Sequence, residues 1–285
     1  MSGLGLALIL AAAGLHATWN FLIKRAGQGA AFMWVVSAVA TVVYAAPTLG
    51  LVLYQPPHIG GLGLLFITAS ALIHVGYYLT LQTGFRVGDF SLVYPIARGT
   101  GPVLTTIFAV LLLGERPSLL ALGGIALVTA GAFVLGGGGV RSAPASRKAI
   151  GFGLLTGLFI ASYTLVDKYS VSVLLVPPLL LDWASHALRV VILLPWALAD
   201  REGVRRAWQA HRLEAVGVGV LSPLAYILVL TAMIFTPVSY VAPAREVSIL
   251  IGAVMGAKLL AEGHVVRRLC GAGAIVAGVL ALALG

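Results

Sequence analysis

Charged side chains are scarce in this sequence. They make up 9% of its 285 residues, whereas about 25% is usual in a soluble domain. Hydrophobic residues make up 60%, so lipid must be the solvent for much of the surface. The formal net charge of +9 could suggest nucleic acid as a partner. The basic residues argue against it, because they lie in short loops between apolar runs, where anionic headgroups and topology explain them.

Cysteine is almost absent, and so are the motifs of enzymes. The one cysteine, Cys270, excludes an intramolecular disulfide and a cysteine zinc site, and we expect it to be a small buried residue among glycines. The sequence has no P-loop, G-x-S-x-G or H-E-x-x-H motif. Asp182 and His186 have no nucleophile spaced to join them. We therefore expect no catalytic residues, no metal and no cofactor.

Long apolar runs are what the sequence does have. A membrane span needs about 20 mostly apolar residues. The first run, Leu4 to Ile23, has no basic residue before it and no cleavage site after it, so we expect it to stay in the membrane. Ten candidate spans follow from this length, at 3–23, 30–53, 61–83, 90–112, 118–136, 150–168, 176–198, 214–234, 239–260 and 266–284. Between the seventh and eighth, 200–214 could form a short amphipathic surface helix.

The two halves of the chain repeat one another. Ser91-Leu-Val-Tyr-Pro95 matches Ser239-Tyr-Val-Ala-Pro243, and after a one-residue deletion Arg98 falls on Arg245 and Glu115 on Glu262. Gly124 and Gly131 fall on Gly271 and Gly278. Five spans per half is an odd number, so the halves must have opposite orientations. The predicted fold is an all-α membrane protein of ten helices in two inverted five-helix repeats, 1–136 and 150–285, joined by a cytoplasmic linker, 137–149.

Basic residues fall mainly on one side of the predicted bundle. Loops after the odd-numbered spans hold twelve Lys and Arg residues, and the other loops hold only Arg116 and Lys168. Because basic loops stay in the cytoplasm, we expect a multi-pass protein of the bacterial inner membrane with both termini in the periplasm.

Five ionisable residues lie inside the predicted spans: Arg98, Asp182, Arg189, Arg245 and Glu246. Each costs about 2.5–3.5 kcal/mol if it is unpaired, so they must pair, face water, or both. One interpretation is a polar lock between helices, for example Glu246 with Arg98. The other is a cationic lining for a carboxylate-bearing solute, because guanidinium binds carboxylate in bidentate fashion. The two are compatible.

Aromatic and histidine side chains also lie well inside the spans, away from the interfaces where Trp and Tyr usually gather. Each could simply pack, with its polar atom bonded to a neighbouring backbone. Concentrated on a few spans, they favour a pocket with apolar walls and a few polar groups. With the arginines, the predicted substrate-binding residues are Trp19, His74, Tyr78, Tyr94, Arg98, Tyr163, Trp183, His186, Tyr226 and Arg245.

Prolines and glycines mark special points of the helices. Pro95, Pro102 and Pro243 interrupt the fourth and ninth spans, and each removes a backbone hydrogen bond. We expect a kink at one of them at least, and they are candidate gating hinges. The G-x-x-x-G spacings at 153/157 and 252/256 and the Gly- and Ala-rich last span indicate close packing or a dimer surface.

The ten spans in two halves, the proline of the fourth span and Gly114-Glu115-Arg116-Pro117 at its end together resemble the drug/metabolite transporter superfamily, EamA-like branch. Within that branch the chain looks most like the YddG-type amino-acid exporters. The resemblance implies a central cavity between spans 1, 3, 4, 6, 8 and 9, which by position would take Trp19, Tyr78, Tyr94, Arg98, Tyr163, Tyr226 and Arg245. Span 1 has no carboxylate, unlike the small multidrug members, which argues against proton-coupled export of drug cations.

The predicted function is a secondary transporter that exports amino acids, aromatic or neutral ones included, or related metabolites by alternating access around a midplane cavity. A nucleotide-sugar, sugar-phosphate or nucleobase carrier is an alternative, because two arginines would suit it equally well. A non-transporting membrane enzyme or assembly subunit is a second. We expect arginines to hold Asp182 and Glu246 ionised, which predicts facilitated diffusion. The expected partners are a small-molecule substrate and the lipid bilayer, without nucleic acid, and the expected state is a monomer or weak homodimer.

Overall fold

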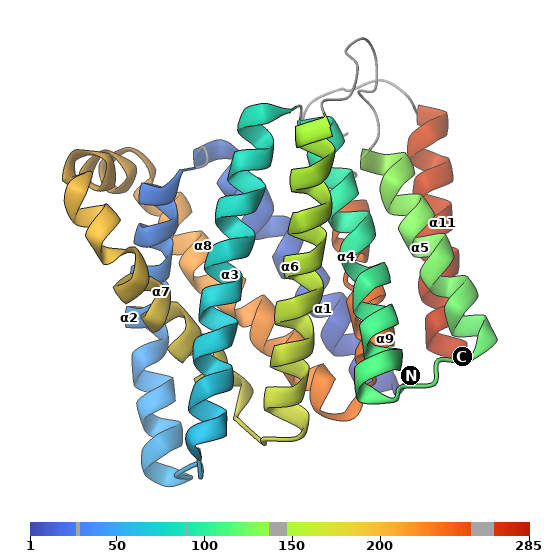
Figure 1. Ribbon diagram of the computed structural model, residues 1–285, viewed down its shortest axis with the longest axis horizontal. Helices are drawn as coiled ribbons and strands as arrows, with labels where there is room; N and C mark the ends of the chain where they lie inside the picture. The colour runs from blue at the N-terminus through green and yellow to red at the C-terminus, as the bar shows by residue number, and fades with distance from the viewer. Residues whose placement is uncertain (27–28, 89, 137–146, 252–264) are drawn as a thin grey trace.

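The computed structural model describes residues 1–285 except 27–28, 89, 137–146 and 252–264. In the described part every regular element is a helix, which confirms the all-α prediction. Figure 1 shows the helices standing side by side as a bundle. They are α1 (Gly3–Ala26), α2 (Ala30–Tyr54), α3 (Gly61–Val87), α4 (Phe90–Leu113), α5 (Leu119–Gly136), α6 (Arg147–Ser172), α7 (Pro178–Ala199), α8 (Arg201–Phe235), α9 (Val238–Ala244) and α11 (Val265–Leu284).

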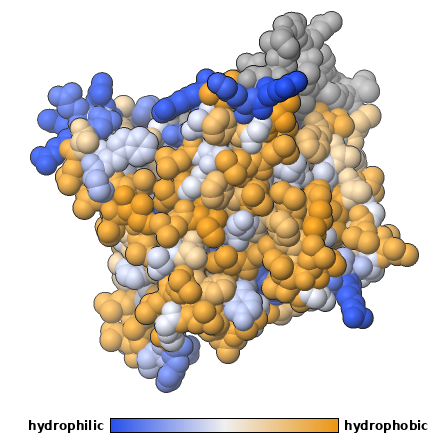
Figure 2. Space-filling view, viewed as in Figure 1, coloured by the Kyte–Doolittle hydropathy of each residue, from blue (hydrophilic) through white to orange (hydrophobic). Residues whose placement is uncertain are grey.

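Seven of the described helices, α1 to α4 and α6 to α8, are long and apolar enough to cross a membrane. The apolar stretches of α5 and α11 are shorter, at Leu119–Leu135 and Leu269–Leu284. Figure 2 shows a broad apolar surface over the middle of the molecule, with hydrophilic residues gathered at its two ends. Leu53, Leu111 and Leu112 are among the large apolar side chains that the structure exposes, each at 70% or more. Lipid contact accounts for such exposure, so the chain is a multi-pass membrane protein.

The ninth predicted span, 239–260, is not one continuous helix over the part that the structure describes. Helix α9 ends at Ala244, Arg245 and Glu246 form a turn, and helical backbone resumes at Val247. Pro243 lacks the N–H that would continue the helical ladder, and Glu246 N bonds instead to the Pro243 carbonyl at 3.0 Å. In contrast, Pro95 and Pro102 lie within the continuous helix α4. The remainder of that span, 252–260, and the Gly252/Gly256 pair lie outside the described residues.

The stretch 200–214 is helical, as expected, but it is the first part of α8 rather than a separate element. Asp200 caps it by accepting a hydrogen bond from Gly203 N at 2.9 Å. The helix then bends at His211, whose backbone is not helical (φ −135°, ψ 33°). In Figure 1 this segment lies at the upper left, across the end of the bundle. The bend lets a surface segment continue directly into the span.

The Gly-Glu-Arg-Pro turn after α4 holds the start of α9. Gly114 has a φ of +68°, a left-handed conformation that suits glycine and ends the helix. The carboxylate of Glu115 then accepts hydrogen bonds from Val238 N at 2.7 Å and Ser239 N at 2.9 Å. The N-terminal amides of a helix need such acceptors. This turn therefore fixes the helix that leads to Arg245.

Glycines bring α5 and α11 into close contact. A Cβ on Gly124 would lie 2.7 Å from the Gly278 carbonyl, and one on Gly131 would lie 2.7 Å from the Gly271 carbonyl. The last helix is thus a packing surface, and its glycine face is occupied by α5. Cys270 is exposed on α11, so the expectation of a buried cysteine is wrong, since it lies on a face that α5 does not cover. Gly153 packs against Ile96, so the first G-x-x-x-G pair joins α6 to α4.

Both termini lie at the same end of the bundle, at the lower right in Figure 1. The N-terminal ammonium donates to the Ala283 carbonyl at 3.3 Å. The opposite end carries the starts of α6 and α8, with the exposed residues Arg147, Lys148, Arg201, Arg205 and Arg206. The most basic loops therefore lie opposite the termini, as the sequence predicted.

Candidate functional site

A cavity of about 150 Å³ lies in the interior of the bundle. Seven helices contribute to it, α1 to α4 and α6 to α8, together with the turn after α9. Its polar or aromatic lining residues are His16, Trp19, Ser37, His74, Tyr77, Arg98, Tyr163, Asp182, His186, Arg189, Ser222, Tyr226 and Arg245.

The fold brings most of the predicted substrate-binding residues to this cavity. Those on its lining are Trp19, His74, Arg98, Tyr163, His186, Tyr226 and Arg245. Tyr78, Tyr94 and Trp183 are not on it. Tyr78 donates to the Gly29 carbonyl at 2.8 Å and accepts from Gln82. Trp183 donates to the Thr41 carbonyl at 2.9 Å. These two bonds tie α3 to the start of α2, and α7 to α2.

The aromatic wall of the cavity is a packed cluster. The His74 ring stacks on Tyr163 with centroids 4.1 Å apart and meets Tyr226 edge-on at 5.7 Å. Tyr77 meets Tyr163 edge-on at 5.7 Å. His74 Nδ1 lies 2.9 Å from the Ser70 carbonyl, which makes Nδ1 the protonated nitrogen. His16 and Trp19, which also line the cavity, meet edge-on with ring centroids 4.5 Å apart.

Arg98 is held in an ion pair. Its Nε lies 3.2 Å from Glu246 Oε2, and its guanidinium donates to Ser248 Oγ at 3.3 Å. Both partners of the pair are almost fully buried, at 8% and 3% exposed. The predicted lock between Glu246 and Arg98 is therefore present, and it joins α4 to the turn after α9.

Arg245 is placed differently although it is the neighbour of Glu246 in the sequence. Its guanidinium lies over the Tyr226 ring, with Cζ 5.3 Å from the centroid. Among the residues that the structure describes, it makes no ion pair and no side-chain hydrogen bond. It lines the cavity and is only partly buried. This arginine is available to a ligand, whereas Arg98 is engaged.

Three residues on one face of α7 approach the cavity from another side, as their i, i+4, i+7 spacing indicated. His186 Nε2 lies 3.9 Å from Asp182 Oδ1, and Arg189 donates to Ser185 Oγ at 3.1 Å. Within the described residues Asp182 forms no ion pair with an arginine. The expected pairing with an arginine is therefore present for Glu246 but not for Asp182 in this part of the chain.

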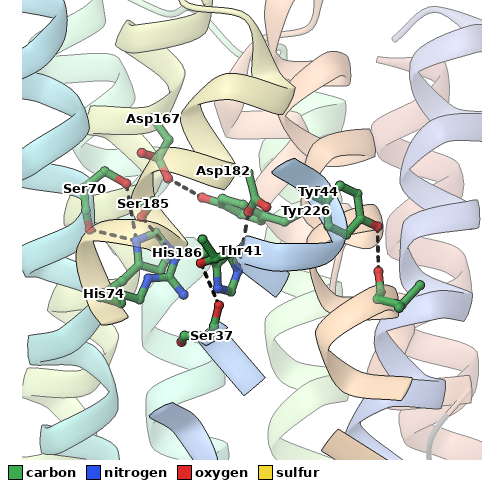
Figure 3. A network of polar contacts seen from close by, with 12 residues as sticks. Ser37, Thr41, Tyr44, Ser70, His74, Asp167, Asp182, Ser185, His186 and Tyr226 are labelled. Atoms are coloured by element: carbon green, nitrogen blue, oxygen red, sulfur yellow. Dashed lines mark hydrogen bonds and ion pairs between the residues drawn. The ribbon is translucent and has the colours of Figure 1, made fainter. Parts of the chain in front are cut away.

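Sequence reasoning missed Asp167, a fully buried carboxylate on α6. Tyr226 donates to its Oδ2 at 2.5 Å, as Figure 3 shows. The predicted span 150–168 ends one residue after Asp167, and the five ionisable residues expected inside the spans do not include it. In the structure α6 runs to Ser172, which carries Asp167 into the interior. Lys168 turns away and donates to the Met233 carbonyl at 2.6 Å and the Thr236 carbonyl at 3.1 Å.

The candidate hinges lie close to the two arginines. Pro95 and Pro102 flank Arg98 within α4, and Pro243 precedes Arg245 by two residues at the end of α9.

In the part of the chain that the structure describes, no three His, Cys, Asp or Glu residues gather as metal ligands do.

Comparison with known proteins gives two positive findings. The sequence pattern of the EamA-like transporter family matches residues 3–137 and again residues 147–284. A solved structure, described only as the crystal structure of a protein, superposes with a TM-score of 0.77 at 16% identity, covering 100% of this chain and 98% of the other. At that identity the likeness concerns the fold alone. No curated protein matches the chain.

Proposed function

Because the chain belongs to the EamA-like transporter family, we propose that it exports amino acids or closely related carboxylate-bearing metabolites across the bacterial inner membrane. Members of a transporter family move their solutes rather than react with them, and we assign no catalytic residue. We propose export rather than uptake because the sequence resembles the YddG-type exporters.

Arg245 is the observation that carries the proposal. A guanidinium that has no ion-pair partner in the described chain and faces a cavity inside a membrane bundle is costly unless a ligand neutralises it. A carboxylate does so with two parallel hydrogen bonds. The rings of Tyr163, Tyr226 and His74 beside it provide the apolar walls that an aromatic or aliphatic side chain would pack on.

The ion pair of Arg98 with Glu246 favours an amino acid over a phosphate-bearing solute. A sugar phosphate or nucleotide sugar brings at least one more negative charge, and Arg98 or Arg189 would have to meet it. Arg98 is bound to Glu246 and Ser248, so its charge is already balanced. Arg189 interacts electrostatically with the carboxylate of Asp182, which also lines the cavity and opposes a phosphate. We therefore rank the sugar-phosphate and nucleotide-sugar alternatives below amino acids, and the enzyme or assembly-subunit alternative last.

We further propose that transport proceeds by alternating access of two inverted repeats, 1–136 and 150–285. Two features support this. The family pattern matches the chain twice, over nearly these ranges. In the repeat, Gly124 corresponds to Gly271 and Gly131 to Gly278, and the close contacts are Gly124 with Gly278 and Gly131 with Gly271. Exchanging the halves turns one contact into the other, as a two-fold axis would. Pro95, Pro102 and Pro243 are then the proposed hinges.

Counterflow in liposomes tests the proposal. Purified protein is reconstituted into vesicles preloaded with one unlabelled amino acid, and entry of the labelled form is followed for a panel of neutral, aromatic, basic and acidic amino acids. We expect accumulation of at least one neutral or aromatic member, and none of sugar phosphates. Protein-free vesicles serve as the control. Counterflow of a sugar phosphate or nucleotide sugar, with none of any amino acid, would reverse our ranking.

A further inference from the structure

A second cavity, of about 200 Å³, lies at the end of the bundle that carries the basic loops. Its lining includes Trp34 near the start of α2, Arg86 near the end of α3, Trp196 near the end of α7 and Val204 near the start of α8. Among the described residues it shares none of its lining with the central cavity. It lies between the two halves of the chain, since α2 and α3 belong to the first half and α7 and α8 to the second.

Two arginines give this second cavity a positive charge. Arg86 is exposed and acts electrostatically on Tyr78, whose hydroxyl donates to the carbonyl of Gly29 on the cavity wall at 2.8 Å. Arg201 Nε donates to the Leu198 carbonyl at 3.3 Å, which folds its guanidinium back over the end of α7. Within the described chain neither arginine forms an ion pair. Both charges are therefore available to an anion.

One carboxylate, that of Asp200, also lines the second cavity. Its Oδ1 accepts a hydrogen bond from Gly203 N at 2.9 Å, and the positive end of the α8 dipole partly balances its charge. In the part of the chain that the structure describes, it forms no ion pair with Arg86 or Arg201. An anion in the cavity thus meets two free cations and one carboxylate that is already engaged.

The surroundings of the second cavity match the boundary between lipid headgroups and acyl chains. Trp196 is exposed, and tryptophan gathers at this boundary. Val191, Leu194 and Leu198 are exposed on α7, so lipid chains can cover this helix as far as the cavity. Figure 2 shows hydrophilic residues gathered at the upper left, where Figure 1 places the start of α8. A lipid whose chains lie on α7 would bring its headgroup to the arginines.

We propose that the second cavity binds the headgroup phosphate of an anionic phospholipid, with Arg86 and Arg201 on the phosphate and Trp196 against the glycerol. A guanidinium binds two phosphate oxygens at once. Basic pockets between transmembrane helices on the cytoplasmic side suit such headgroups, and the basic loops place this end in the cytoplasm. The bound lipid joins α2 and α3 of the first half to α7 and α8 of the second, and so stabilises this end of the bundle.

The first test compares two lipids. Purified, delipidated protein in an uncharged detergent is titrated with phosphatidylglycerol or with phosphatidylcholine of the same acyl chains. Native mass spectrometry counts the bound lipid, and thermal unfolding measures stability. We expect phosphatidylglycerol to bind in preference and to raise the melting temperature more, and salt to reduce the preference. Equal binding of the two lipids would overturn the proposal.

The second test removes one charge from the site. We expect Arg86→Gln to raise the half-saturating concentration of phosphatidylglycerol about fivefold, and Arg86→Lys to raise it less, because lysine keeps the charge. Arg147→Gln is the matched control, since Arg147 is an exposed arginine at the same end of the bundle and outside the cavity. Equal weakening by Arg147→Gln would mean that the lipid responds only to net charge, and the site would be wrong.

A third measurement distinguishes a lipid from a soluble phosphate. Glycerol phosphate carries the headgroup phosphate without acyl chains, and we expect it to leave the melting temperature unchanged at concentrations where phosphatidylglycerol saturates. If it stabilises the wild-type protein and not Arg86→Gln, the cavity binds a soluble phosphate and the lipid assignment is wrong. No transported solute enters these three measurements, so their outcome does not depend on the proposed function.

Discussion

At the scale of single residues, the two arginines that the repeat aligns have different surroundings. Arg98 is neutralised by Glu246 at 3.2 Å, and Arg245 lies over an aromatic ring at the cavity surface. A guanidinium balanced inside the protein mainly holds helices together. One that faces a cavity and is not paired with a carboxylate gains more from binding a ligand.

We expect Arg245→Ala to weaken solute binding by about ten- to hundredfold, because hydrogen bonds to a charged group contribute about 1.5–3 kcal/mol. Arg245→Lys should recover part of the binding, since it keeps the charge but loses the planar fork. The measurements are counterflow per folded molecule and binding to detergent-solubilised protein. Arg205→Ala, an exposed arginine at the bundle end, is the control. Unchanged counterflow in Arg245→Ala with a sharply lower melting temperature would assign this arginine to stability instead.

Two tryptophans give a matched comparison of the same substitution. Trp183 Nε1 donates to the Thr41 carbonyl at 2.9 Å, whereas Trp19 Nε1, on a cavity-lining residue, has no partner in the described chain. We expect Trp183→Phe to lower the melting temperature through loss of a bond of about 0.5–1.5 kcal/mol. Trp19→Phe should change solute affinity with a smaller effect on melting. Melting in detergent and counterflow are measured for both, and the opposite assignment of effects would refute this distinction.

These residues also show what sequence could not resolve. In the sequence, four residues look alike, because each is an aromatic side chain with a polar group inside a span: Trp19, Trp183, Tyr78 and Tyr163. Only their contacts in the folded protein show which of them line the cavity and which form hydrogen bonds between helices. Asp167 was missed for a different reason. A carboxylate next to a lysine near an expected span end looks interfacial, and only the extra length of α6 places it in the interior.

At the scale of elements, apolar length predicted nearly all of the described helices to within a few residues, because the bilayer sets that length. The break after Ala244 could not be placed in the same way. The apolar run continues through it, and Pro243 alone does not say whether a helix bends or stops, since Pro95 and Pro102 stay inside α4. Tertiary contacts determine where α9 ends. Glu115 binds the first turn of α9, and the Arg98–Glu246 ion pair holds the turn that follows the helix.

Neighbouring glycines on α5 test the packing of α5 against α11. A Cβ on Gly124 would lie 2.7 Å from the Gly278 carbonyl, whereas one on Gly123 would meet nothing within 4 Å. We expect Gly124→Ala to destabilise the protein by about 1–3 kcal/mol through overpacking of a backbone contact. Gly123→Ala should be neutral or slightly stabilising, because alanine favours helix by up to about 1 kcal/mol over glycine. Thermal unfolding in detergent measures both, and equal effects would mean that the two helices can separate at little cost.

At the scale of the whole molecule, the internal repeat was visible in the sequence because matched prolines, arginines and glycines recur in register. The cavity was not, because it is formed by helices distant in the chain. Asp167, Tyr226 and Arg245 come together only when α6, α8 and the turn after α9 pack against one another. These three belong to the second half, and His74 and Arg98 of the first half line the same cavity as Tyr226 and Arg245. One solute can therefore contact both halves, as the proposed alternating access requires.

The orientation of the molecule in the membrane is the last prediction. Both termini share one end of the bundle, and the exposed Arg147, Lys148, Arg201, Arg205 and Arg206 lie at the other. Because basic segments are retained in the cytoplasm, the termini should face the periplasm. A phosphatase that works only in the periplasm should be active when fused after Gly285 and inactive when inserted in the linker 137–149, with a cytoplasmic fluorescent reporter giving the opposite pattern. An inactive terminal phosphatase beside a bright terminal reporter would place both termini in the cytoplasm and contradict the prediction.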